Sequence, residues 1–260
     1  MLLAIDVGNT NIVLGVFEGE LLTESWRLVT MRERTSDEIG ILVTQLFERS
    51  DIDLGRIDGI ILSSVVPPLT RTMEEMCERF FDKSPLTVDP ASNTGMPVLY
   101  QPPTDVGADR VVNAVAAYEA FGRAEEIPLI VVDFGTATTF DAISKRGEYI
   151  GGVICPGIGI SADALFQRAA RLPRVDVRKP PSVVGQTTVT SMQSGLFFGY
   201  VSMVDGIVAR MRDEMEDGAR ASCIATGGMA DVLAGETTAI QRVEPDLTLQ
   251  GLRIIWQRNQ

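Results

Sequence analysis

Apolar residues occur along the chain in two recurring patterns. Short apolar runs bounded by glycine, proline or charged residues are typical of buried strands, and apolar positions spaced by three and four are typical of helices. Residues 2–29 show the first pattern three times, with turns at 7–10 and 18–20. We therefore predict strands over 2–6, 11–17 and 21–28, connected as a meander.

The same arrangement recurs over residues 127–155. Strands are predicted over 128–133, 138–144 and 148–154, again with glycine in the turns between them. In both segments the first strand ends in an aspartate, Asp6 or Asp133, which is followed two residues later by glycine. A repeat of this length indicates duplication of a whole domain.

Helices and strands alternate after each meander. Thr35 to Glu38 form a capping sequence for a helix to residue 50, and Pro67 begins another to residue 81. The other predicted elements are strands over 57–66 and 222–226, and helices over 107–122, 158–170, 190–216, from Gly227 and Gly228 onward, and at the end of the chain. This alternation predicts an α/β fold of two lobes, 1–125 and 126–260, each a mixed β-sheet with flanking helices, and a cleft between the lobes.

One predicted helix carries a long apolar stripe of Phe197, Tyr200, Val204, Ile207 and Met211. Such a stripe usually faces the core. It is equally compatible with a dimer interface, and the sequence leaves both uses open.

Composition and charge restrict the partners. The 260 residues are 45% hydrophobic and 22% charged, as in an ordinary globular protein. With 23 Lys and Arg against 35 Asp and Glu, the formal charge is -12, so we expect no nucleic-acid partner and no binding to anionic membranes. The N-terminus lacks the cationic part of a signal peptide, and the neutral run 150–166 is interrupted by glycine, proline and aspartate. We expect a cytoplasmic protein without a membrane span.

Cysteine and histidine usage excludes several kinds of site. Cys77, Cys155 and Cys223 are too widely spaced for a disulfide framework or a paired metal site, and we expect buried free thiols. The absence of histidine rules out a Ser-His-Asp triad and a histidine zinc site. Acid–base chemistry at neutral pH must therefore use carboxylates, Lys, Tyr or Cys.

The turn after Asp6 is a candidate phosphate site. Gly8 lets the backbone approach a ligand, and Asn9 and Thr10 offer side-chain donors beside backbone N–H groups. Asp6 suits Mg²⁺, directly or through water. The alternative is a plain hairpin turn.

Two further turns have related chemistry. The turn 133–139 places three threonines around a glycine after Asp133, although threonine is also common in strands. Gly227 and Gly228 lack Cβ atoms, which suits a flat base and ribose, although such a pair also begins many helices. The chain has neither a P-loop nor a Gly-x-Gly-x-x-Gly dinucleotide motif.

In their order along the chain these motifs resemble the acetate and sugar kinase/heat-shock 70/actin superfamily, and within it the type III pantothenate kinases. The motifs that carry the resemblance are Asp6-Val-Gly-Asn-Thr-Asn, Gly107-Ala-Asp-Arg, Asp133-Phe-Gly-Thr-Ala-Thr-Thr, Gly151-Gly-Val-Ile-Cys-Pro-Gly, Ala225-Thr-Gly-Gly and the ending Leu247-Thr-Leu-Gln-Gly-Leu. The resemblance implies duplicated actin-like (ribonuclease H-like) lobes with ATP in the cleft. It also implies phosphorylation of the terminal hydroxyl of pantothenate, the first step towards coenzyme A, by a homodimer that needs Mg²⁺ with ATP and a monovalent cation, K⁺ or NH₄⁺.

The resemblance also implies roles for individual residues. Asp109 would be the catalytic base, whereas the residues alone also allow it to be an N-cap of the following helix. Substrate contacts are implied for Tyr100, Gly107, Ala108, Asp109, Arg110 and Thr188. ATP contacts are implied for Asp6, Val7, Gly8, Asn9, Thr10, Asn11, Ile12, Val13 and Thr136, with Asp6 the candidate for Mg²⁺ and Asp133 the candidate for K⁺. Because many relatives have Asn or Ser where this chain has Thr187, either Thr187 or Thr188 is the candidate substrate contact.

Two other functions fit the same motifs. The first is another small-molecule kinase of the superfamily, such as an N-acetyl-sugar kinase, but those usually carry a zinc-binding Cys/His cluster and this chain has no histidine. The second is a regulator that keeps the fold without turnover, although both acidic turns and Asp109 are present.

Overall fold

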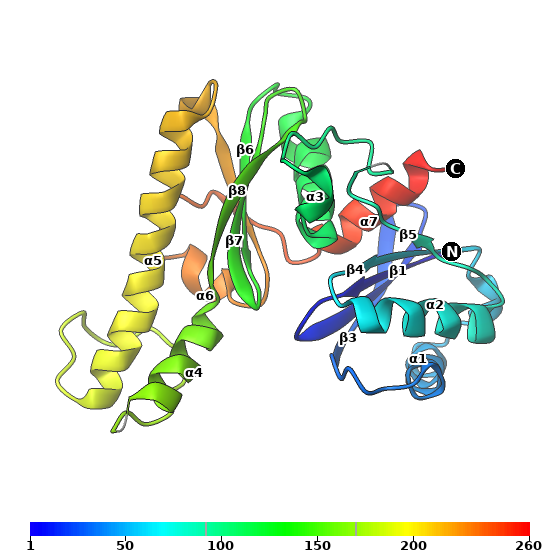
Figure 1. Ribbon diagram of the computed structural model, residues 1–260, viewed down its shortest axis with the longest axis horizontal. Helices are drawn as coiled ribbons and strands as arrows, with labels where there is room; N and C mark the ends of the chain where they lie inside the picture. The colour runs from blue at the N-terminus through cyan, green and yellow to red at the C-terminus, as the bar shows by residue number, and fades with distance from the viewer. Residues whose placement is uncertain (92, 170) are drawn as a thin grey trace. The chain divides into compact units, whose positions relative to one another are not determined.

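The computed structural model describes residues 1–91, 93–169 and 171–260 and divides into two compact units (Figure 1). The first unit consists of Met1–Ala116 together with Leu247–Gln260, and the second consists of Ala117–Asp246. Each unit has its own five-stranded sheet with helices packed against it. The predicted α/β class with two mixed sheets is therefore confirmed.

The sheet of the first unit contains the predicted meander and two further strands. Its order is β3-β2-β1-β4-β5, in which β1, β2 and β3 pair antiparallel and β4 and β5 join in parallel. The strands are β1 (Leu2–Val7), β2 (Asn11–Glu18), β3 (Leu21–Val29), β4 (Gly59–Ser64) and β5 (Leu86–Thr87). The strand predicted over 57–66 is therefore longer than β4, and β5 was not predicted.

One face of this sheet is covered by α1 (Ser36–Arg49) and α2 (Pro67–Phe81). Leu3, Ile5 and Val7 alternate along β1 and point into this core, as the pleat of a strand requires. The predicted capping box starts α1: the Glu38 N–H donates to Thr35 Oγ1 over 3.3 Å, and the Thr35 N–H donates to Glu38 Oε2 over 2.8 Å.

The opposite face of the sheet is covered by α7 (Leu247–Arg258), the last helix of the chain. A Cβ atom at Gly15 would lie 2.8 Å from Leu249 Cδ1, and one at Gly59 would collide with the ring of Trp256. The glycines therefore let the helix lie directly on β2 and β4. The units thus differ from the predicted lobes 1–125 and 126–260, because the C-terminal helix completes the first unit.

The sheet of the second unit repeats the topology of the first. Its order is β10-β9-β6-β7-β8, with β6, β7 and β8 antiparallel and β9 and β10 added in parallel. The strands are β6 (Leu129–Phe134), β7 (Ala137–Ile143), β8 (Tyr149–Pro156), β9 (Ser222–Thr226) and β10 (Arg242–Val243). The predicted duplication is confirmed, since β6 to β10 take the places of β1 to β5.

The described residues of the second unit include the α-helices α4 (Ile158–Arg168), α5 (Thr188–Glu214) and α6 (Ala230–Ala234). Figure 1 shows α5 alongside the sheet, and its Phe197, Tyr200 and Val204 side chains are buried in the core. The core role of the predicted stripe is therefore confirmed. The helix predicted over 158–170 ends at Arg168, and Ala170 lies outside the described residues.

The helix predicted over 107–122 consists of an α-helix followed directly by a π-helix. It begins as α3 (Ala108–Ala117) and continues as a π-helix, η3 (Tyr118–Gly122), where the first unit passes into the second. The remaining short turns are the 3₁₀-helices η1 (Leu54–Arg56), η2 (Pro103–Asp105) and η4 (Gly218–Arg220).

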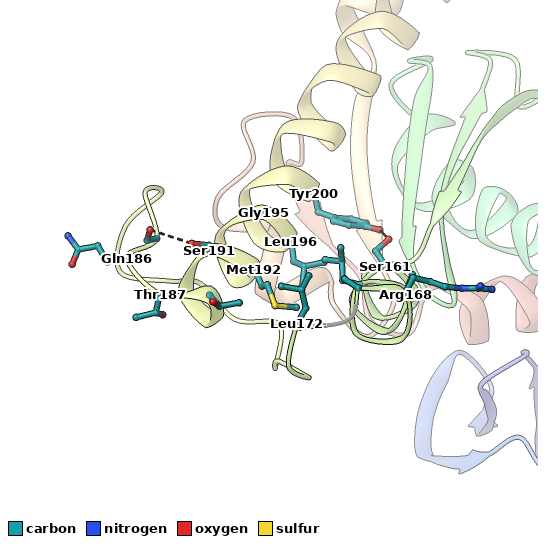
Figure 2. Close-up of a pocket in the computed structure, with 15 residues that line it drawn as sticks. Ser161, Arg168, Leu172, Gln186, Thr187, Ser191, Met192, Gly195, Leu196 and Tyr200 are labelled. Carbon is teal, nitrogen blue, oxygen red and sulfur yellow. Dashed lines mark hydrogen bonds between the residues drawn. The ribbon is translucent and has the colours of Figure 1, made fainter.

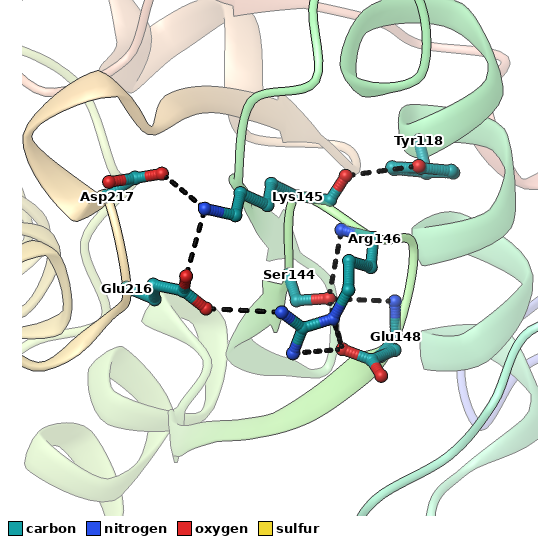
Figure 3. Close-up of polar contacts among 7 residues, drawn as sticks. All are labelled: Tyr118, Ser144, Lys145, Arg146, Glu148, Glu216 and Asp217. Atoms are coloured by element: carbon teal, nitrogen blue, oxygen red, sulfur yellow. Dashed lines mark hydrogen bonds and ion pairs between the residues drawn. The ribbon is translucent and has the colours of Figure 1, made fainter.

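A polar network fixes the turn between β7 and β8 (Figure 3). Lys145 Nζ lies 2.9 Å from Glu216 Oε1 and 2.7 Å from Asp217 Oδ2, just beyond the end of α5. Arg146 also pairs with Glu216, and the Tyr118 hydroxyl donates to the Lys145 carbonyl over 3.2 Å. A single surface ion pair contributes little to stability, but this network connects the β7–β8 turn to η3 and to the segment directly after α5.

The three cysteines are free thiols, as predicted. Burial raises the pKa of Cys77 and of Cys223 to about 12, so both are unreactive packing residues. Cys155 is half-buried. Within the described part of the chain, no helix is long and apolar enough to cross a membrane.

Candidate active site

The first acidic turn follows β1 and is closed by hydrogen bonds to the backbone of Gly8. The Gly8 N–H donates to the Asn11 carbonyl over 3.0 Å, and the Thr30 hydroxyl donates to the Gly8 carbonyl over 2.7 Å. Asn9 and Thr10 are exposed at the tip of the turn, while Asp6 is half-buried at its base. Asn9 and Thr10 can therefore donate hydrogen bonds to a ligand at the tip of the turn, with the Asp6 carboxylate at its base, as a phosphate site requires.

Not every residue of the predicted ATP segment has an accessible side chain. Val7 and Ile12 are almost fully buried in the core of the first unit. Any contact that they make with a nucleotide must therefore use their backbone atoms. Gly8, Asn11 and Val13 are half-buried.

Asp109 lies in the first turn of α3, after the loop that contains Tyr100 and Gly107. Its Oδ1 accepts a hydrogen bond from the Arg110 N–H over 2.8 Å. Because α3 begins at Ala108, Asp109 is the second residue of the helix, and the simple N-cap interpretation does not apply.

The environment of Asp109 suits a proton acceptor. Burial raises the pKa of this carboxyl above its ordinary value, and the hydrogen bond from the Arg110 N–H offsets this only in part. A carboxylate with a raised pKa is a better base at neutral pH than an exposed one. Ala108 and Arg110, the flanking residues, are both buried at 8% exposure.

The loop before Asp109 lies at the same end of the strands as Asp6. A Cβ atom at Gly107 would lie 2.6 Å from Asp109 Oδ1 and 3.7 Å from a methyl group of Val65, the residue directly after β4. The Val65 N–H in turn donates to the Val7 carbonyl over 3.0 Å. The acidic turn and the candidate base therefore lie at the carboxyl ends of the parallel strands β1 and β4, where ligands bind in open α/β sheets.

In the second unit, three predicted motifs lie together at the equivalent strand ends. Asp133 lies beside Thr226 in the register of β6 and β9. Gly227, which follows, has φ +92°, and a Cβ atom there would lie 2.5 Å from Asp133 Oδ1. The Gly157 N–H donates to the Thr136 carbonyl over 3.1 Å. Glycine thus permits the close approach of the turns that follow β6, β8 and β9.

The two candidate threonines have different roles at the start of α5. Thr187 is the N-cap: its hydroxyl oxygen accepts the Thr190 N–H over 3.1 Å and lies 2.9 Å from Thr190 Oγ1. Thr188 is the exposed first residue of the helix. Its hydroxyl is therefore the one available to a ligand.

Thr187 and Thr188 line an open groove between α4 and α5, with a volume of about 1070 Å³ (Figure 2). Leu165, Met192 and Leu196 supply much of its apolar wall. The Tyr200 hydroxyl lies 2.6 Å from Ser161 Oγ and donates to the Pro156 carbonyl over 2.7 Å. These bonds tie the part of the groove wall formed by Ser161 and Tyr200 to the end of β8.

Comparison with known proteins gives the family. A family model described as type III pantothenate kinase matches residues 2–210. The chain belongs to the type III pantothenate kinase family. A type III pantothenate kinase of Myxococcus xanthus (strain DK1622) is 57% identical to it over 259 residues, which cover 100% of this chain and 99% of the relative.

Two solved structures share the fold of this type III pantothenate kinase family member at much lower identity. A protein from Campylobacter jejuni, described as a candidate Baf family transcriptional activator, aligns with a TM-score of 0.60 at 19% identity over 99% of this chain and 98% of its own. An inorganic polyphosphate/ATP-glucomannokinase from Arthrobacter sp. strain KM aligns with a TM-score of 0.53 at 15% identity, over 99% of this chain and 98% of its own. This likeness concerns the fold alone and confirms the predicted actin-like architecture.

The predicted contacts of this pantothenate kinase family member divide between the two units. Asp6, Gly107 and Asp109 converge in the first unit, and Asp133, Thr136 and Gly227 converge in the second. Sequence reasoning missed Ser63, which lies beside Asp6 in the register of β1 and β4. The available signal was a polar residue near the end of an otherwise apolar strand.

Proposed function

We propose that the chain is an ATP-dependent pantothenate kinase, which converts pantothenate to 4'-phosphopantothenate in the first step of coenzyme A biosynthesis. The observation that carries this proposal is the full-length identity of 57% to a type III pantothenate kinase. The geometry supports it, because both acidic turns and the candidate base lie at strand ends where phosphate and hydroxyl groups can be held.

Asp109 is the proposed catalytic base. Its Oδ1 is held by the Arg110 N–H, so the carboxylate has a defined orientation, and Oδ2 is the oxygen that we assign to the substrate proton. The terminal hydroxyl of pantothenate attacks the γ-phosphorus and passes its proton to Asp109. The bond from this phosphorus to the bridging oxygen breaks, and ADP leaves. Phosphoryl transfer depends mainly on positioning and charge neutralisation, so a carboxylate base is sufficient.

The nucleotide contacts are proposed at both acidic turns. Residues 6–13 would hold phosphate oxygens through backbone N–H groups and the side chains of Asn9 and Thr10, and Thr136 would do so from the second unit. Mg²⁺ usually enters such sites with one or two carboxylates and the phosphates of the substrate. Asp6 fits this use, because it offers one carboxylate, half-buried at the base of the first acidic turn. Bound there, Mg²⁺ would neutralise phosphate charge.

A monovalent cation, K⁺ or NH₄⁺, is proposed at Asp133. Asp133 is half-buried at the end of β6, and Gly227 packs so closely against it that an added Cβ atom would lie 2.5 Å from Oδ1. An oxygen at the end of a buried strand suits such a hard cation.

Pantothenate is proposed to contact Tyr100, Gly107, Ala108, Arg110 and Thr188. Arg110 suits the pantothenate carboxylate because a guanidinium can bind it with two parallel hydrogen bonds. Thr188 is preferred over Thr187 because the Thr187 hydroxyl is used as the N-cap of α5.

We also propose a cytoplasmic homodimer. Several apolar side chains remain exposed on α4 and at the start of α5: Ile160, Leu165, Phe166 and Val189 are 39–48% exposed. Such a patch beside an apolar groove is typical of a protein interface.

Coupled ADP release tests this function directly. Purified protein receives ATP, Mg²⁺ and K⁺, with and without pantothenate, and we expect ADP only when pantothenate is present. The same assay in Na⁺-only buffer should show little activity, which K⁺ or NH₄⁺ restores. No pantothenate-dependent ADP from folded protein would refute the proposed substrate, and indifference to the cation would refute the role of Asp133.

A further inference from the structure

A buried hydroxyl lies directly beside the first acidic turn. Ser63 is the partner of Asp6 in the parallel register of β1 and β4, so both side chains point to the same face of the sheet. Ser63 is 0% exposed, and its Oγ has no hydrogen-bond partner among the described residues. An unsatisfied buried hydroxyl lowers stability, and native proteins rarely keep one without a use.

Its neighbour shows how the chain treats a structural serine. Ser64 points to the other face, towards α2, where the Thr70 hydroxyl donates to Ser64 Oγ over 2.8 Å and the Val66 N–H donates over 3.2 Å. Two adjacent serines in one strand therefore differ: Ser64 is satisfied by the fold, and Ser63 is not.

The face that Ser63 shares with Asp6 is connected through α7 to α3, the helix of the candidate base. It is the face covered by α7, which contacts α3 where a Cβ atom at Gly251 would collide with the Val112 carbonyl. Asp109 lies one helical turn before Val112 on α3. Ser63 thus lies fully buried beside a half-buried Asp6, on the face of the sheet that α7 covers.

The second unit repeats the pairing. Asp133 is the register partner of Thr226, which is 2% exposed, on the strands equivalent to β1 and β4. In both units a buried hydroxyl residue therefore lies next to the aspartate of the acidic turn.

We propose that Ser63 is a positioning residue of the nucleotide site, whose hydroxyl donates a hydrogen bond to the Asp6 carboxylate when the phosphates and their cation are bound. A carboxylate accepts several hydrogen bonds at once, so this bond can add to the interactions that Asp6 already makes. It would hold the carboxylate in the orientation that faces the phosphate groups. The proposal rests on the proposed role of Asp6 at the nucleotide.

The test compares Ser63→Ala with Ser64→Ala. The dissociation constant of Mg²⁺·ATP is measured by calorimetry without pantothenate, together with Tm and the KM values for ATP and pantothenate. We expect S63A to keep or raise Tm, to weaken Mg²⁺·ATP binding at least tenfold, and to leave the pantothenate KM unchanged. S64A should lower Tm and leave nucleotide binding unchanged.

A nucleotide dissociation constant within about twofold of the wild-type value in S63A would overturn the proposal. Unfolding of both S63A and the similar-sized Ser63→Cys variant would also overturn it, because Ser63 would then be needed by the fold. Calorimetry does not involve pantothenate. A failure of the proposed acceptor specificity would therefore appear in the turnover assay and leave this comparison intact.

Discussion

The close packing of Gly227 against Asp133 allows a sharp test of the second acidic turn. Gly227 has φ +92°, a conformation that costs an L-residue about 1–2 kcal/mol. In Gly227→Ala, the new methyl would lie 2.5 Å from Asp133 Oδ1 and 2.7 Å from the backbone N and C atoms of Phe134. All three contacts are shorter than carbon and oxygen atoms tolerate.

The overlap cannot be relieved by one flexible side chain. Phe134 is 3% exposed at the end of β6, which is the central strand of its sheet, so its backbone is fixed. The turn after β9 must therefore shift, and the Asp133 carboxylate must move with it. Overpacking of this kind costs about 1–3 kcal/mol, which together with the backbone strain makes roughly 2–5 kcal/mol. We expect Tm to fall by roughly 5–15 °C.

The assay measures Tm by calorimetry and kinase activity as a function of K⁺ concentration. Because Asp133 is displaced, G227A should need at least about tenfold more K⁺ for half-maximal activity, which corresponds to about 1.4 kcal/mol. Gly235→Ala is the matched control, since its added Cβ would meet no neighbouring atom of the described residues within 4 Å beyond the adjoining backbone. A G227A variant with the Tm and K⁺ requirement of the wild type would refute this account of the turn.

Three further predictions follow from the site and the core. Asp109→Asn should lower kcat by about 10²–10⁴-fold, or about 3–5 kcal/mol. Because burial raises the pKa of Asp109 in the folded protein, its ionisation opposes folding as pH rises through that pKa. D109N should therefore be at least as stable as wild type at neutral pH. The kcat of the wild type should fall as acid protonates Asp109. A D109N variant with the kcat of the wild type would exclude Asp109 as the base. Thr188→Val should raise the pantothenate KM about tenfold at unchanged Tm. Thr187→Val should instead cost about 1 kcal/mol of stability through loss of the N-cap and leave the pantothenate KM unchanged. The reverse pattern would make Thr187 the substrate contact. Leu252→Ala, at a fully buried position of α7, should cost about 2–5 kcal/mol in calorimetry, and an unchanged Tm would show that α7 does not pack on the sheet of the first unit.

Local patterns were enough to predict most elements. The capping sequence at Thr35 and the proline at the start of α2 lie where the helices begin, since both signals act within one helical turn. The two-residue strands β5 and β10 were missed because a strand that short has no alternation to detect.

Long-range packing could not be predicted in the same way. The apolar spacing of α7 shows that one face is buried, but not which of two similar sheets it covers. Gly15 and Gly59, which accommodate α7, are far from it in the sequence and have no pattern that points to a helix.

The acidic turns were predictable as motifs, because Asp and Gly must lie close together in the chain to form them. The choice between Thr187 and Thr188 was not, since it depends on which hydroxyl caps α5. Ser63 was missed because its significance comes from the β1–β4 register and from the absence of a hydrogen-bond partner among the described residues.

The split composition of the first unit affects how the chain matures on the ribosome. Residues 1–116 are translated before the second unit, but α7, which covers one face of their sheet, is translated after it. The whole of the second unit, residues 117–246, is an uninterrupted segment that can fold earlier, as domains generally do during synthesis. The first unit is therefore completed only after the whole second unit has been translated, and one face of its sheet stays uncovered until Leu247–Arg258 has been synthesised.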